Sequence, residues 1–191
     1  MFAGWLRPNR VLIALAVVAT GVLACRDTTT PKEVSTVGVA FDPLSTDASP
    51  GFTSALIGRG NLGPFHINSK FAGYRVDLKS PDNTDIVVAN INITPGSHSG
   101  WHYHPGPVLV VVKTGTITFY HAAGSREDGE GSDDAACPPT RYTAPATFTE
   151  SGGVVGIARN EGAIDATAVA TFFVPKGSAT RFNAPKPANC A

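Results

Sequence analysis

The sequence predicts an all-β domain, built as a sandwich or a barrel. Its 191 residues include 20 glycines and 15 prolines but only 8% aromatic residues, a composition typical of short strands joined by many turns. Runs rich in β-branched residues recur at short intervals with turn residues between them. No long stretch has the 3.6-residue periodicity of an amphipathic helix. With 42% hydrophobic residues, a chain of this length can form one domain with its own core.

The strongest strand signals lie in the middle and C-terminal parts of the chain. Residues 85–93 (DIVVANINI) follow a stretch of turn residues, 80–83 (SPDN), where we expect the chain to reverse. Thr114-Gly115 predicts a two-residue hairpin between strands 108–113 and 116–121. Further strands are expected at 74–78, 146–150, 154–158 and 166–174.

The N-terminal residues 1–24 predict a lipoprotein signal peptide. Arg7 and Arg10 precede an uncharged apolar run at 11–24, which is shorter than the ~20 residues that a membrane-spanning helix needs. Small residues before Cys25 resemble a bacterial lipobox, so we expect Cys25 to carry the lipid. The protein would then be exported and held at the membrane by this anchor only. An ordinary signal peptide without lipidation is the alternative.

Residues 25–50, rich in Thr, Ser, Asp and Pro, predict a flexible tether, with 37–41 as a candidate edge strand. The folded domain is expected over 51–191, and residues 122–136 are expected to form an exposed acidic loop. In an oxidising compartment the remaining pair, Cys137 and Cys190, predicts a disulfide. Two free thiols are the alternative.

Two histidines one residue apart are the first candidate for a functional site. On a strand, residues i and i+2 share a face, so His102 and His104 should point the same way and Tyr103 the other way. Two neutral imidazoles on one face can bind a divalent metal ion. Exposed or hydrogen-bonded histidines without a metal are the alternative.

Gly96, His102, His104 and Gly115 stand in the order and spacing of the first cupin motif, and the region 96–120 resembles a small bacterial cupin. The resemblance implies a double-stranded β-helix, or jelly-roll barrel, with a small-molecule pocket inside. It also implies a metal ion such as Fe, Mn, Ni or Zn on three histidines and a glutamate. Because cupins include dioxygenases, isomerases, decarboxylases and binding proteins, the resemblance constrains the fold more than the reaction.

The sequence departs from the cupin pattern at two ligand positions. The motif's glutamate corresponds to Val108, and the histidine of the second motif corresponds to Gly156, although Asn160 is present four residues later. Two of the four usual ligands are therefore missing.

The predicted hairpin offers a replacement ligand. Its register sets Val108 opposite His121, with Cβ atoms ~5 Å apart on one face. His102, His104 and His121 would then form an all-imidazole site suited to Zn²⁺, Cu²⁺ or Ni²⁺. A one-residue bulge would turn His121 outward.

The other polar candidates carry less weight. His98 could be a fourth ligand but is expected in a solvated loop, and His66 is expected to be structural. Glu150 is expected to be a surface glutamate, because nothing in the sequence indicates burial or a charged neighbour. Tyr103, Val108 and Val110 are the residues expected to line the ligand pocket.

These observations leave two hypotheses for function. The favoured one is a binding module that holds a small molecule, a loosely bound divalent metal (Zn, Ni, Cu, Fe or Mn), or both, without a complete catalytic site. The alternative is a metal-dependent dioxygenase or isomerase that uses His102, His104 and His121. A formal charge of zero with no basic stripe argues against nucleic acid as a partner. An edge strand could pair two copies into a homodimer.

Overall fold

The structure of the protein is a computed structural model that describes residues 47–122, 137–188 and 190. These residues all belong to one compact unit, Gly38–Ala191. Several predicted features lie outside the described residues. They are the predicted signal peptide, the predicted lipidation site Cys25, residues 25–46 of the predicted tether with its expected edge strand, and residues 123–136 of the expected acidic loop. In the described part, no helix reaches the length and apolarity that membrane crossing would require.

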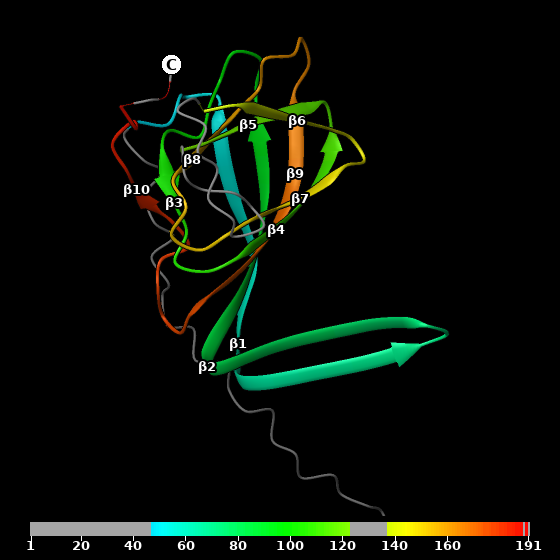
Figure 1. Ribbon diagram of the computed structural model, residues 1–191. Coiled ribbons are helices and arrows are strands. Elements are labelled where there is room, and N and C mark those ends of the chain that lie inside the picture. Colours follow the sequence, from blue (N-terminus) through cyan, green and yellow to red (C-terminus); the bar gives the residue numbers. More distant parts are fainter. Residues whose placement is uncertain (1–46, 123–136, 189, 191) are drawn as a thin grey trace, which may run out of the picture. The chain divides into compact units, whose positions relative to one another are not determined.

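The described residues form two five-stranded antiparallel sheets, with strand orders β1-β2-β9-β4-β7 and β10-β3-β8-β5-β6 (Figure 1). The predicted all-β jelly-roll fold is confirmed. The strands are β1 (Phe52–Phe71), β2 (Tyr74–Ile93), β3 (His102–Tyr103), β4 (Val108–Thr114), β5 (Thr116–His121), β6 (Pro139–Thr143), β7 (Thr147–Glu150), β8 (Gly156–Arg159), β9 (Ala166–Pro175) and β10 (Phe182–Asn183).

The core lies on the inner faces of the strands, and the alternating direction of the side chains along each strand decides which residues reach it. In β4, Val108, Val110 and Val112 are buried, whereas Leu109 and Val111 are about half exposed. Strand β9 alternates in the same way, but most of its inward residues are small alanines (Ala166, Ala168 and Ala170). These short side chains leave room for a cavity next to the core.

The expected hairpin at Thr114-Gly115 is wrong, because β4 and β5 belong to different sheets. Gly115 has a φ of +67°, and a Cβ there would lie 2.7 Å from the carbonyl oxygen of Asp165. The chain therefore crosses between sheets at this glycine. Strand β4 pairs instead with β7 and β9. A two-residue turn signal is local, whereas a valine-rich strand gains more burial between two neighbours than in a hairpin.

The expected reversal at 80–83 is also wrong, because β2 continues through these residues. Ser80 pairs with Phe65 and Thr84 with Gly63, so the turn residues form an irregularity in one long strand. The reversal occurs at Ala72-Gly73, both with positive φ, as in a tight hairpin turn. The outer part of this β1–β2 hairpin, the arm, extends away from the two sheets (Figure 1).

A buried polar cluster holds the base of the arm. The Asp85 carboxylate accepts hydrogen bonds from Arg59 Nε at 2.8 Å, Asn61 Nδ2 at 3.0 Å and the backbone N–H of Gly177 at 2.9 Å. Burial by itself raises the pKa of Asp85, but the hydrogen bonds from Gly177, Asn61 and Arg59, with the Arg59 charge, outweigh it and lower the pKa. The carboxylate is therefore ionised and ties β1, β2 and the segment after β9 together.

Both ends of the described chain are attached to the sheets. Cys137 and Cys190 form the predicted disulfide, with Cα atoms 5.1 Å apart, and Cys190 packs with Trp101 and Ile157. At the other end, Ser49 exchanges hydrogen bonds with the backbone of His98, at 2.7 Å from His98 N–H to Ser49 Oγ. The last residues of the predicted tether thus belong to the folded unit.

Candidate metal centre

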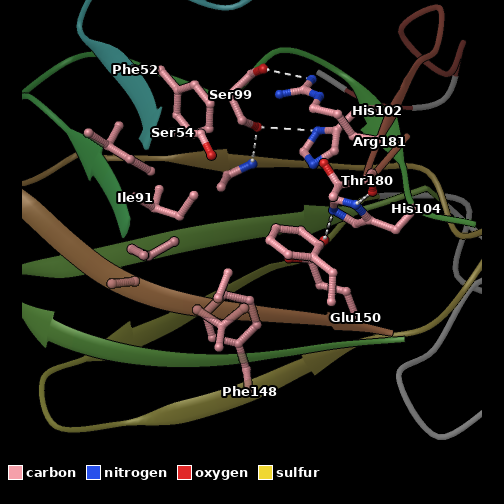
Figure 2. A pocket seen from close by; sticks show the side chains of 17 residues that line it. Phe52, Ser54, Ile91, Ser99, His102, His104, Phe148, Glu150, Thr180 and Arg181 are labelled. Atoms are coloured by element: carbon pink, nitrogen blue, oxygen red, sulfur yellow. Dashed lines mark hydrogen bonds and ion pairs between the residues drawn. The ribbon is translucent and has the colours of Figure 1, made fainter. Parts of the chain in front are cut away.

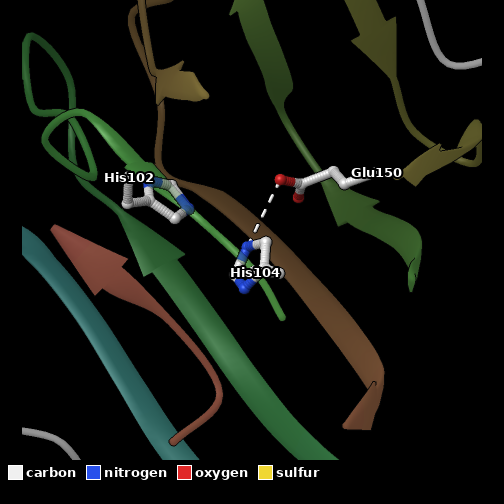
Figure 3. A group of neighbouring side chains, drawn as sticks. All are labelled: His102, His104 and Glu150. Atoms are coloured by element: carbon white, nitrogen blue, oxygen red, sulfur yellow. Dashed lines mark ion pairs between the residues drawn. The ribbon is translucent and has the colours of Figure 1, made fainter. Parts of the chain in front are cut away.

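The side chains of His102, His104 and Glu150 converge on one point (Figure 3). One ligand atom of each lies within 4.8 Å of the others. The closest contact joins His104 Nε2 to Glu150 Oε2, at 3.3 Å. All three side chains are largely withdrawn from solvent, with His102 only 6% exposed. The two histidines predicted from their spacing therefore share one site, and a third donor joins them.

Backbone carbonyl groups fix the orientation of both imidazole rings. His102 Nδ1 lies 2.8 Å from the carbonyl oxygen of Gly100, and His104 Nδ1 lies 2.6 Å from that of Thr180. A carbonyl oxygen can only accept a hydrogen bond, so each Nδ1 carries a proton and donates it. Each ring is thereby left with Nε2 as the atom that can bind a metal ion. This outer support is the arrangement that metal-ligating histidines almost always have.

The protonation states at this site suit a metal ion. Burial lowers the pKa of His102 to about 3, assisted by the positive charges of His104 and Arg181, so its imidazole is neutral at pH 7. Burial alone raises the pKa of Glu150, but the positive charge of His104, its hydrogen bond and the other nearby imidazoles lower it overall. An ionised carboxylate and a neutral imidazole are the forms in which these residues bind metals.

The expectation that Glu150 is a surface glutamate is wrong. Strand β7 pairs with β4 so that Glu150 lies directly opposite Val108, the position where the cupin motif has its glutamate. The carboxylate missing from position 108 is thus supplied by the neighbouring strand. The alternation in β7 carried a signal for this, because Glu150 shares a face with the buried Phe148.

The second missing ligand has a packing explanation. A Cβ at Gly156 would lie 2.5 Å from the ring of Phe119, so a histidine cannot fit there without moving that ring. Gly156 pairs with His102 on one side and His121 on the other. The sheet therefore places His121 in the same row as His102, two strands away.

His121 lies close to the site but outside the group of three converging ligand atoms. The register that set it opposite Val108 is wrong, since its strand pairs with β6 and β8. Its ring contacts that of Phe119, with centroids 4.5 Å apart. Burial lowers the pKa of His121, and the Glu150 charge opposes this shift. A role for His121 as a metal ligand stays a prediction.

A cavity of about 60 Å³ adjoins the three residues (Figure 2). Of the residues predicted to form the pocket, Val110 lines this cavity. Val108 is fully buried in the core, and Tyr103 points away and stacks on Phe182, with ring centroids 5.3 Å apart. The polar residues that line the cavity are Ser54, Ser99, His102, His104, Glu150, Thr180 and Arg181.

The two remaining histidines have structural partners. His98 Nδ1 accepts a hydrogen bond from the backbone N–H of Gly100 at 3.1 Å, in the loop that also bonds Ser49. His66 lies on the exposed arm, 2.9 Å from the Asp77 carboxylate.

Comparison with solved structures finds similar chains at low sequence identity. An oxalate oxidase is 20% identical with a TM-score of 0.42, over 52% of this chain and 46% of its own. The oxalate decarboxylase of Lactobacillus farciminis, in a formate complex, is 13% identical with a TM-score of 0.41, over 51% of this chain and 26% of its own. Peruvianin-I, a cysteine peptidase from Thevetia peruviana latex, is 16% identical with a TM-score of 0.46, over 76% of this chain and 72% of its own.

The chain spans less than half the length of the oxalate oxidase and oxalate decarboxylase chains that it resembles. Protein-family models give no match to it, and neither do curated proteins. Its two antiparallel sheets form the jelly-roll fold of the cupins, and His102, His104 and Glu150 could hold a divalent metal ion.

Proposed function

We propose that the protein binds one divalent transition-metal ion through Nε2 of His102, Nε2 of His104 and the carboxylate of Glu150, and that it binds a small molecule in the adjoining cavity. One observation carries this proposal. Both histidines direct Nε2 toward an ionised carboxylate, while backbone carbonyl groups hold both Nδ1 protons.

The donor set narrows the choice of metal. Three imidazoles would favour Zn²⁺, Cu²⁺ or Ni²⁺, but two imidazoles with one carboxylate also suit Fe²⁺ and Mn²⁺. We therefore expect Fe²⁺, Mn²⁺ or Zn²⁺ to be the resident ion. In the metal-free protein, a proton between His104 and Glu150 would compete for the same point, because their atoms are 3.3 Å apart.

Metal uptake tests the proposal directly. The purified protein, stripped with a chelator, is titrated with Zn²⁺, Mn²⁺ and Fe²⁺ by calorimetry, with elemental analysis of the loaded samples. We expect about one ion per chain in the wild type and little uptake in His102→Ala. His66→Ala on the exposed arm is the matched control and should bind like the wild type. Uptake that survives His102→Ala would exclude this site.

His121 is tested in the same titration. If it is a fourth ligand, His121→Ala should weaken metal binding by at least the roughly 10–100-fold seen when residues that only support the ligands are replaced. Unchanged uptake would leave three protein ligands.

A metal-dependent enzyme is the second candidate, and Glu150 is the observation that favours it. Two histidines and one carboxylate with open positions form the donor set of non-haem Fe(II) oxygenases. The missing glutamate at position 108 argued against such chemistry, and Glu150 removes that objection. Oxygen consumption by the Fe²⁺-loaded protein with a panel of small carboxylates, compared with Glu150→Gln, tests this candidate. Equal rates in both proteins would exclude catalysis at this site.

We also propose that the protein is an exported lipoprotein anchored through Cys25. The apolar run and lipobox-like residues before Cys25 support this proposal, and so does the Cys137–Cys190 disulfide, since such bonds persist in oxidising compartments. A clickable fatty acid should label the wild type and not Cys25→Ala in cells. Equal labelling of both would refute the anchor.

A further inference from the structure

We propose that the cavity binds a small organic anion with one carboxylate and a short apolar body, and that Arg181 holds the carboxylate. The inference rests on the proposed function for the charge of the neighbouring metal ion, but its main support is the position of Arg181. None of the sequence motifs pointed to this arginine, which lies between β9 and β10.

Arg181 stands at the polar end of the cavity. Its Nη2 donates a hydrogen bond to the carbonyl oxygen of Ser99 at 3.0 Å, and its Cζ lies 5.9 Å from the centroid of the Phe52 ring. Figure 2 shows its guanidinium beside Ser99 and His102, on the side of the cavity where the metal site lies. A guanidinium is a planar fork of N–H donors that matches a carboxylate. These contacts hold the fork at the cavity wall.

The charges around the cavity favour an anion once a metal ion is bound. The residues that line the cavity include one arginine, Arg181, and one carboxylate, Glu150, whose formal charges are opposite. These two charges cancel each other in the metal-free protein. A divalent ion at the site would leave the cavity wall with an excess of positive charge, which attracts a negatively charged guest.

The size and lining of the cavity define the rest of the guest. A volume of about 60 Å³ holds roughly four to six non-hydrogen atoms, since one water needs ~10–15 Å³ of such space. Away from Arg181 and the metal site the walls are largely apolar, so a second carboxylate directed toward them would be buried without a partner. A short monocarboxylate therefore fits better than a dicarboxylate. The apolar walls include Phe52, Ile91, Ile93, Val110, Ile117 and Phe172.

Propionate is the probe, and NMR titration of the Zn²⁺-loaded full chain is the measurement. Propionamide has the same shape without the charge, and malonate adds a second carboxylate. We expect propionate to bind at least tenfold more tightly than propionamide in the Zn²⁺-loaded protein. In the metal-free protein, where malonate has no ion to chelate, we expect propionate to bind at least tenfold more tightly than malonate. Propionamide binding as tightly as propionate in the first comparison, or malonate in the second, would overturn the inference.

Substitutions of Arg181 test its role. Arg181→Gln should weaken propionate binding at least tenfold and leave propionamide binding unchanged, whereas Arg181→Lys should retain part of the affinity because it keeps the charge. Arg141→Gln, which changes an arginine with a 71% exposed side chain on β6, is the matched control and should bind like the wild type. Melting curves identify any variant that does not fold. Wild-type affinity for propionate in folded Arg181→Gln would overturn the inference.

The same samples separate this inference from the proposed metal site. Elemental analysis measures Zn²⁺ uptake, and the propionate titration is repeated on metal-free protein, where we expect weaker but still Arg181-dependent binding. A protein that takes up no Zn²⁺ but binds propionate through Arg181 would refute the metal site and support the anion site. Normal Zn²⁺ uptake without propionate binding would support the metal site and refute the anion site.

Discussion

Replacing Glu150 by Gln should abolish tight metal binding while leaving the fold intact. Gln has the same shape but no charge. A metal ion among the three ligand atoms would be no farther than 4.8 Å from the carboxylate. At an effective dielectric constant of about 20, a dication and a unit negative charge at this distance attract by about 7 kcal/mol. Displacing water and the proton near His104 offsets much of this attraction. We expect a net loss of about 3 kcal/mol, or roughly 100-fold in Kd.

Calorimetric titration of the wild type and Glu150→Gln with Zn²⁺ measures this loss, and circular dichroism confirms that both are folded. An unchanged Kd in the folded variant would refute the assignment of Glu150 as a ligand.

A second variant tests the geometry behind this assignment. Val108 and Glu150 are direct cross-strand partners, so their Cβ atoms should be ~5 Å apart on one face. Glu150→Val should lose metal binding, and the double variant Val108→Glu/Glu150→Val should regain part of it by returning the carboxylate to the β4 position. A double variant that folds but binds no better than Glu150→Val would show that the carboxylate can act only from β7.

Three further predictions concern stability, each measured by urea denaturation. Asp85→Asn should lose about 2–3 kcal/mol at pH 7, because its carboxylate is hydrogen-bonded and nearly buried against Arg59. Folding lowers the pKa of Asp85 below its ordinary 3.8. The stabilisation by the ionised carboxylate is therefore complete above pH 3.8 and disappears as the pH falls through the folded-state pKa. The same difference in unfolding free energy between wild type and Asp85→Asn at pH 7 and at pH 2 would contradict this prediction. Gly115→Ala should lower the free energy of unfolding by about 2–4 kcal/mol, because φ at Gly115 is +67° and the new Cβ would lie 2.7 Å from a backbone oxygen. A loss below about 1 kcal/mol would mean that the crossing between the sheets tolerates a side chain. Replacing Cys137 and Cys190 by Ser should lower the free energy of unfolding by about 4 kcal/mol, since the disulfide closes a loop between residues 53 apart. Equal stability of the oxidised wild type and the double variant would show that the C-terminal tail needs no covalent anchor.

The features that depend on local sequence patterns could be predicted from the amino-acid sequence. Runs of β-branched and other apolar residues identified the strands at 108–113 and 166–174, and their burial alternates in the structure because successive side chains of a strand point to opposite sides. The same rule placed His102 and His104 on one face, and the structure finds both at one site. The resemblance to the first cupin motif identified the fold, because the residues that carry it lie within 96–115 and are recognised without knowing which strands pair.

Which strands lie side by side is visible only in the folded chain, and the set of residues at the site depends on that pairing. Glu150 follows Val108 by 42 residues in the sequence, and no local signal states that β7 pairs with β4. The hairpin prediction joined β4 to β5 because Thr114-Gly115 has suitable turn residues, but burial of the valines between β7 and β9 determined the pairing. That pairing brought Glu150 to His102 and His104. Its ionised state likewise depends on His104, a neighbour that is close only in the folded chain.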